Sequence, residues 1–155
     1  MAKRVVVTGM GVISPIGNDV PTFWNNLVNG VCGIDYIQEF PTENLPVRIA
    51  GKVKDFHPEN YGMDKGFSRK QDLFTQYGVA AAYEAMNQAG LIAEGEGQNI
   101  DPFRLGVYVG SGIGGFEIQY RETAKMIEDP SGQWISPLFI PTMISNIAAG
   151  HIAIK

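Results

Sequence analysis

The sequence is poor in residues that define several classes of protein. Its 155 residues include one cysteine, Cys32, so an intramolecular disulfide is impossible and a reducing, cytoplasmic location is expected. Only two histidines are present, His57 and His151, and they lie far apart in the chain. Since metal sites need clustered ligands, we expect no metal site, and no cofactor is expected either.

Charge and long hydrophobic runs are also scarce. Charged residues make up 18% of the chain and the net charge is −4, which gives no overall positive field for nucleic acid. Lys3 and Arg4 precede an apolar stretch, as in a signal peptide, but Gly9, Gly11 and Pro15 interrupt it. No run approaches the ~20 apolar residues of a membrane helix. We therefore expect one compact domain with neither a nucleic-acid nor a membrane partner.

The first third of the chain begins like a βαβ unit. Residues 4–7 are β-branched and apolar and predict a strand buried in a parallel sheet. A glycine turn follows, and a helix is predicted over 19–30, with Asp19 as its cap and Gly30 as its end. Residues 31–67 predict an irregular excursion with a short strand at 49–53. Cys32 lies in this excursion and is expected to be a small buried thiol.

The clearest predicted helix spans residues 68–90. Ser68 and Gln71 occupy capping-box positions, and Gly90 ends the pattern. Small residues on several faces indicate a helix packed between two layers. A second buried strand is predicted at 103–109.

Two further helices are expected after that strand. The first spans 115–127, and the second begins at about Pro141. An apolar stripe runs along the last helix to Lys155 without a stop signal, so we expect this sequence to be part of a longer protein.

A glycine motif of spacing G-x-G-x-x-G follows the second predicted strand at Gly110, Gly112 and Gly115. A dinucleotide site also needs an acidic residue about 20 positions on, at the end of the next strand. Glu128 and Asp129 instead precede Pro130 in a turn after a helix. The motif alone is a weak sign of nucleotide binding. The structural alternative is that the glycines let two strand-to-helix turns, here and at 9–14, pass close to other backbone.

Five segments resemble the N-terminal part of the β-ketoacyl-acyl carrier protein synthases, most closely the type II elongation enzymes of bacterial fatty-acid synthesis. In order along the chain, they are VVVTGMGVISPIGN, SRKQDLFTQYG, GSGIGG, SPLFIP and SNIAAGH. This resemblance implies an α/β, thiolase-like layered αβαβα fold. Residues 1–155 would form the N-terminal half only, cut before the turn that carries the nucleophile.

The resemblance implies a decarboxylative Claisen condensation. An acyl group moves from acyl carrier protein to a cysteine, malonyl-carrier protein loses carbon dioxide, and the resulting carbanion attacks the thioester. In the family the nucleophile and the histidines follow the point matching Lys155, so no catalytic residue is expected here. Cys32, His57 and His151 match none of them. Two alternatives stay open: a non-catalytic chain-length partner of a condensing enzyme, and a free-standing nucleotide-binding module.

The resemblance also implies two sets of binding residues. The first borders the acyl-chain pocket: Gly112 and Ile113 lie in the glycine loop, with Ile113 as a gate, and Phe139 lies near the same tunnel. The partners implied are acyl carrier protein, in acyl and malonyl forms through phosphopantetheine, and a second copy of the protein in a homodimer.

The second set is basic and would meet the acidic carrier protein: Lys65, Arg69 and Lys70. At the start of the predicted helix, cations oppose the helix dipole, so a purely structural role is disfavoured there. Relatives often carry more basic residues before the ISP segment, where this sequence has Gln133 and Trp134. Docking is therefore expected to depend on the Lys65–Lys70 cluster.

Overall fold

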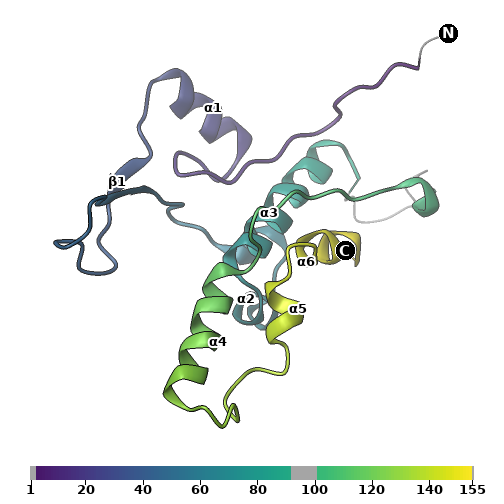
Figure 1. Cartoon of the computed structure of the whole chain (residues 1–155). Helices are drawn as coiled ribbons and strands as arrows, with labels where there is room; N and C mark the ends of the chain where they lie inside the picture. The colour runs from purple at the N-terminus through teal and green to yellow at the C-terminus, as the bar shows by residue number, and fades with distance from the viewer. Residues whose placement is uncertain (1–2, 92–100, 155) are drawn as a thin grey trace.

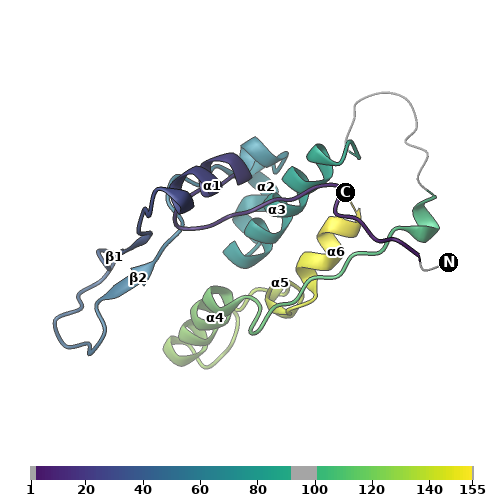
Figure 2. The same cartoon turned by 90° about the horizontal axis from the view of Figure 1, so that it is seen from above.

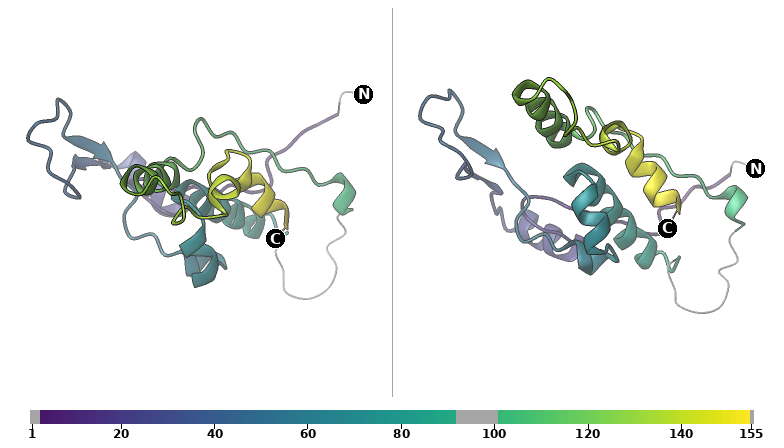
Figure 3. Two further views of the ribbon diagram at one scale, coloured as in Figure 1. Left: turned by 60° about the horizontal axis from the view of Figure 1, so that its bottom comes forward. Right: turned by 90° about the horizontal axis from the view of Figure 1, so that it is seen from below.

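The computed structural model describes residues 3–91 and 101–154. Figure 1 shows an extended N-terminal arm and a projecting hairpin beside a helical body, whose helices lie in two layers (Figures 2 and 3). One layer holds α1 (Val20–Val28), α2 (Lys65–Lys70) and α3 (Leu73–Gln88). The other holds α4 (Phe116–Glu128), α5 (Phe139–Met143) and α6 (Ile147–Ile154).

The hairpin and two short 3₁₀ helices complete the secondary structure of the described residues. Strands β1 (Ile34–Tyr36) and β2 (Ile49–Gly51) pair antiparallel, with Asp35 opposite Ala50. The 3₁₀ helices are η1 (Pro58–Tyr61) and η2 (Pro102–Arg104).

Helix α3 is the centre of the core. It packs against α6 and η1, and its buried residues Val79 and Ala80 form a cluster with Met63. Residues 9–12 cross another side of the helix, where a Cβ at Gly9 or Gly11 would collide with a backbone carbonyl of α3. The close approach expected of this glycine turn is confirmed, and α3 is covered on more than one side.

Side chains of α3 fasten the N-terminal segment in place. The Glu84 carboxylate accepts hydrogen bonds from the Val12 amide at 2.9 Å and the Val20 amide at 2.7 Å. The Met10 amide donates to Oε1 of Gln88 at 2.6 Å. The turn after residue 7 is therefore held by helix side chains rather than by a neighbouring strand.

Several elements follow the local sequence signals. Asp19 caps α1, accepting a hydrogen bond from the Thr22 amide at 2.7 Å. Gly30 and Gly90 follow α1 and α3 with φ of 68° and 72°, a left-handed conformation that glycine adopts without steric cost. Strand β2 and helix α4 lie where the sequence predicts them.

The two strands predicted for a parallel sheet are not formed. Residues 4–7 and 103–109 have no strand assignment, and the side chains of Val5 and Tyr108 are 95% and 99% exposed. A buried strand needs neighbours on both edges, and β1 and β2 are the only strands in the described ranges. The accessible surface is 11629 Å², whereas a compact monomer of this size exposes roughly 7,700 Å².

The predicted helix at 68–90 is in fact two helices. Gln71 takes an extended backbone conformation between them, so Ser68 lies inside α2 and the predicted capping box is wrong. Asp64 caps α2 and Asp72 caps α3. At the break Asp72 caps α3, and its carboxylate also accepts a hydrogen bond from helix α4, as described below.

Two other predictions were wrong in detail. The last predicted helix is divided into α5 and α6, because Ile144 is extended and ends α5. Cys32 is exposed rather than buried, since it precedes a hairpin that projects away from the helical body.

Candidate functional site

Asp72 joins the α2–α3 junction to the beginning of α4. The residue is 7% exposed, and its Oδ1 accepts a hydrogen bond from the Phe74 amide at 3.3 Å as the cap of α3. Its Oδ2 accepts from the Ile118 amide, in the first turn of α4, at 3.0 Å. One carboxylate therefore stabilises the N-terminal ends of two helices, where anions are favoured.

A basic hollow of about 340 Å³ lies between α2 and α4. Its charged lining residues are four cations and one carboxylate: Arg69, Lys70, Arg121, Lys125 and Glu122. The remaining lining residues come from α4, α5 and the segment between them: Ile118, Ser136, Leu138 and Thr142. We call this feature the α2–α4 hollow.

Glu122 is the buried anion of the α2–α4 hollow, with its side chain 2% exposed. It accepts hydrogen bonds from Lys125 Nζ at 2.7 Å and from the Ser136 amide at 2.8 Å, and Arg121 Nε lies 3.5 Å away. The hydrogen bond from Lys125, followed by that from Ser136, lowers the pKa of Glu122. The carboxylate is thus ionised at neutral pH, and the cations still outnumber it four to one.

The predicted basic residues lie on α2 but in a different part of the helix than expected. Arg69 and Lys70 occupy the last turn of α2, where cations interact favourably with the helix dipole. The argument that they oppose the dipole is therefore wrong. Lys65 is the first residue of α2 and is absent from the lining of the hollow, although its carbonyl accepts from Arg69 Nε at 3.3 Å.

Sequence reasoning missed Arg121 and Lys125. They are four residues apart on α4 and so share one helix face, which is a signal visible in the sequence. Their proximity to α2 depends on the Asp72 contact with α4, a tertiary feature that spacing alone cannot reveal.

The predicted acyl-pocket residues lie in the glycine loop and in α5, two segments that pack against each other. Ile113 is 68% exposed in the glycine loop, and Gly114 after it has φ of 82°. The Gly115 amide donates to the Met143 carbonyl at 2.8 Å, so the loop packs on the end of α5. Phe139 begins α5 and is half-buried. None of the hollows described here is lined by Gly112, Ile113 or Phe139, so the tunnel stays a prediction.

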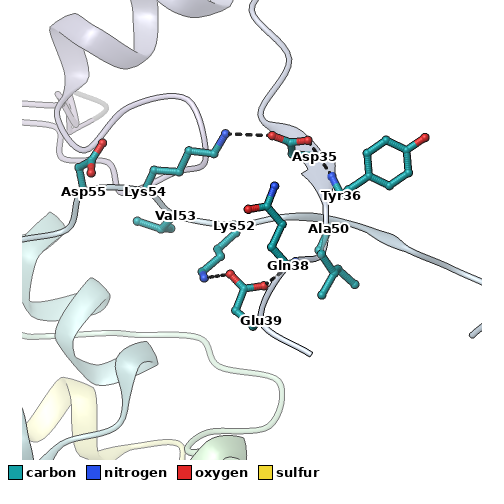
Figure 4. Close-up of a pocket in the computed structure, with 10 residues that line it drawn as sticks. Asp35, Tyr36, Gln38, Glu39, Ala50, Lys52, Val53, Lys54 and Asp55 are labelled. Atoms are coloured by element: carbon teal, nitrogen blue, oxygen red, sulfur yellow. Dashed lines mark hydrogen bonds and ion pairs between the residues drawn. The ribbon is translucent and has the colours of Figure 1, made fainter. Parts of the chain in front are cut away.

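A second polar hollow, of about 500 Å³, lies beside the hairpin (Figure 4). Both of its lysines are paired locally, Lys54 with Asp35 at 3.7 Å and Lys52 with Glu39, and Asp55 adds a further carboxylate, so the hollow has no surplus of cations. The hydrogen bond from Lys52 lowers the pKa of Glu39. We call this feature the hairpin hollow.

The two histidines do not form a catalytic or metal-binding arrangement with Cys32. His57 is exposed, with Nδ1 3.5 Å from Glu59. His151 packs edge-on against Phe67 with ring centroids 4.9 Å apart, and burial lowers its pKa. The expectation of a packed helix histidine is confirmed. In the described residues no three His, Cys, Asp or Glu side chains gather as metal ligands. None of the helices in those ranges combines the length and apolar character of a membrane span.

Comparison with known proteins reveals relatives along the whole chain. The chain is 44% identical to 3-oxoacyl-[acyl-carrier-protein] synthase 2 of Staphylococcus aureus (strain COL) over 98% of its own length and 35% of the relative's. It thus spans about a third of the length of the curated relatives it matches.

Two solved structures resemble the fold. The ishigamide ketosynthase/chain length factor has a TM-score of 0.74 at 26% identity, over 97% of this chain and 36% of that one. The other is AntDE:AntF, a type II PKS acyl-carrier protein in complex with its ketosynthase bound to the hexaketide. It has a TM-score of 0.73 at 27% identity, over 99% of this chain and 40% of that one.

These likenesses confirm the fold class expected from the sequence, the N-terminal half of a thiolase-like α/β fold. The family model described as Beta-ketoacyl synthase, N-terminal domain, matches residues 2–155. The chain belongs to the β-ketoacyl synthase family and carries its N-terminal domain.

Proposed function

We propose that the protein carrying this chain elongates fatty acids by decarboxylative condensation of acyl groups with malonyl-acyl carrier protein. The observation that carries this proposal is the 44% identity to a 3-oxoacyl-[acyl-carrier-protein] synthase over 98% of the chain. The complete protein is expected to be a homodimer.

The chemistry requires a thiolate nucleophile, proton-transfer groups and an oxyanion hole. Cys32 precedes β1, His57 precedes η1 and His151 lies on α6, and none of them is paired with another as a nucleophile and its base. We therefore assign this chain the recognition of the carrier protein and the shaping of the acyl-chain pocket. The 155-residue chain alone is expected to have no condensing activity.

The assay that tests the function uses the complete protein with acyl-carrier protein and radiolabelled malonyl-carrier protein. We expect release of carbon dioxide together with a β-ketoacyl product. Sequencing the gene beyond Lys155 separates the two remaining candidates, because a condensing enzyme needs a cysteine at the nucleophile turn. Decarboxylation without condensation, together with a replaced cysteine, would instead support a chain-length partner, a role that one structural relative's name includes.

For the acyl pocket we propose that Ile113 is the gate. No atom lies within 4 Å of the place where a Cβ of Gly112 would be, so the loop has space before Ile113. Gly114, after Ile113, has a positive φ that would strain any other residue. In the complete enzyme, Ile113→Phe is expected to slow long acyl chains while sparing short ones. An equal loss at every chain length would point to a folding defect.

For carrier docking we propose the basic residues of α2: Lys65, Arg69 and Lys70. The double variant Arg69→Glu with Lys70→Glu is expected to raise the KM for acyl-carrier protein about tenfold, chiefly through the association rate. Activity on a small pantetheine thioester should hardly change, because that substrate lacks the acidic protein surface. If both substrates lose activity equally, the pair is structural and the docking proposal fails.

A further inference from the structure

The α2–α4 hollow contains cations that the docking proposal has not yet used. Arg121 and Lys125 belong to α4, about fifty residues beyond Arg69 and Lys70 in the chain, yet all of them line one hollow. We propose that Arg121 and Lys125 of α4 complete, with Arg69 and Lys70 of α2, a single docking hollow for surface carboxylates of the acidic carrier protein. This inference rests on the proposed function.

The charges that line the hollow are unbalanced. Within the described parts of the chain, neither Arg69 nor Lys70 has a carboxylate oxygen within 4 Å, and Glu122 is the only acidic residue lining the hollow. Like charges brought together repel one another, and a bound anion relieves that repulsion. The surplus of cations therefore favours an anionic occupant. The hairpin hollow has no such surplus, because its lysines are paired.

Glu122 orients the two cations of α4 that contact it. The carboxylate is anchored by the Ser136 amide, and it holds Lys125 Nζ at 2.7 Å and Arg121 Nε at 3.5 Å. The side chains of Arg121 and Lys125 are still 53% and 36% exposed. A guanidinium has five N–H donors, so contact through Nε leaves Arg121 with donors for a partner. Glu122 thus positions these cations at the surface and leaves some of their N–H donors available to a partner.

The segment that leads to Ser136 carries no cation next to the hollow. Its last two side chains before Ile135 are the uncharged Gln133 and Trp134. Because the Ser136 amide is bonded to Glu122, this segment lies directly beside α4 and its cations. Positive charge at this place is therefore supplied by α4. Arg121 and Lys125 are one helical turn apart, a spacing that suits successive carboxylates on an acidic helix.

The test compares the α2 double variant, Arg69→Glu with Lys70→Glu, and three further variants of the complete enzyme by their affinity for the carrier protein at low salt. Arg121→Gln is expected to weaken binding about threefold, as the loss of one exposed charge pair predicts, and to lessen the dependence on salt. Arg121→Lys keeps the charge and should bind nearly as wild type. Arg104→Gln, on η2, removes a cation that does not line the hollow and should change nothing.

A parallel titration uses carrier protein without its phosphopantetheine group. If surface carboxylates occupy the hollow, the Arg121→Gln loss persists with this apo carrier. A loss seen only with the phosphopantetheine form would identify the prosthetic group, rather than surface carboxylates, as the ligand and overturn the inference.

The remaining outcomes separate this inference from the function on which it rests. If the wild-type enzyme binds no carrier protein, the proposed function itself fails. If the α2 variant weakens binding while Arg121→Gln matches Arg104→Gln, only the role of α4 is refuted. If Arg121→Lys loses as much affinity as Arg121→Gln, charge is not the cause and the inference is also refuted.

Discussion

The α2–α4 hollow and the hairpin hollow differ in the balance of their charges. Beside the hairpin, Lys52 and Lys54 each face a carboxylate of β1 or the loop that follows it (Figure 4). Between α2 and α4, four cations and only one carboxylate line the hollow, and that carboxylate, Glu122, contacts two of the four. Lysines that are paired with carboxylates in the same hairpin produce little electrostatic field at a distance, whereas a group of unpaired cations attracts an anionic partner. The comparison favours the α2–α4 hollow as the proposed docking site, although the hairpin hollow is the larger.

The largest expected effect is a loss of stability when the contact between the α2–α3 junction and α4 is removed. Asp72→Ala removes the cap of α3 and leaves the Ile118 amide of α4 without its acceptor. We expect a loss of about 3 kcal/mol in the free energy of unfolding, about 1 from the cap and the rest from the buried amide. Urea denaturation of the complete protein measures this loss.

Asp19→Ala serves as the control for that variant. Asp19 caps α1 alone, so its removal should cost only about 1 kcal/mol. Equal losses in the two variants would refute the view that Asp72 connects two helices.

A smaller loss of stability is expected when Glu122, the buried carboxylate of the α2–α4 hollow, is replaced. Glu122→Gln should cost about 1–2 kcal/mol of stability at neutral pH, because Lys125 and the Ser136 amide lose a charged acceptor. The pKa of Glu122 is lowered in the folded protein, so its ionised form adds stability above its usual pKa. That contribution is lost as pH falls through the lowered pKa, below pH ~4.5. The variant should lack this part of the acid sensitivity, as denaturation at several pH values would reveal.

A still smaller effect concerns the packing of α2 on α6. Burial lowers the pKa of His151, which packs edge-on against Phe67 of α2. The folded protein therefore favours the neutral ring, and protonation as pH falls below ~6.5 favours the unfolded state. His151→Gln should remove a shallow decline in melting temperature between pH ~7 and ~5. An unchanged decline would assign it to other groups.

The hairpin hollow provides the case in which almost nothing should change. The double variant Lys52→Gln with Lys54→Gln removes two cations that are already paired with Glu39 and Asp35. The KM for acyl-carrier protein should stay within about twofold of wild type, because neutralised pairs contribute little to long-range attraction. A tenfold rise would contradict the distinction between the two hollows.

The sequence predicts those parts of the fold that are determined locally. Asp19 and Gly30 bound α1 because a cap and a glycine stop act on their own helix. Strands at 4–7 and 103–109 were wrongly predicted because strand pairing depends on distant segments, and such partners are absent from the described residues.

The candidate site also contains residues that the sequence suggests and residues that only the tertiary structure reveals. The resemblance to ketosynthases implies a role for Arg69 and Lys70, but the predicted capping box at Ser68 put them at a helix start. The break at Gln71, beside the contact of Asp72 with α4, is not visible in the local spacing. Arg121 and Lys125 became candidates only when that contact brought α4 beside α2.

The central claim is that the charge of the α2–α4 hollow recruits an acidic carrier protein. It is tested most directly by measuring kcat/KM of the complete wild-type enzyme for acyl-carrier protein, and for a pantetheine thioester, at increasing salt. Because salt screens attraction between exposed charges, the value for acyl-carrier protein should fall steeply while that for the thioester stays flat. Two flat profiles, or two that fall together, would contradict the account.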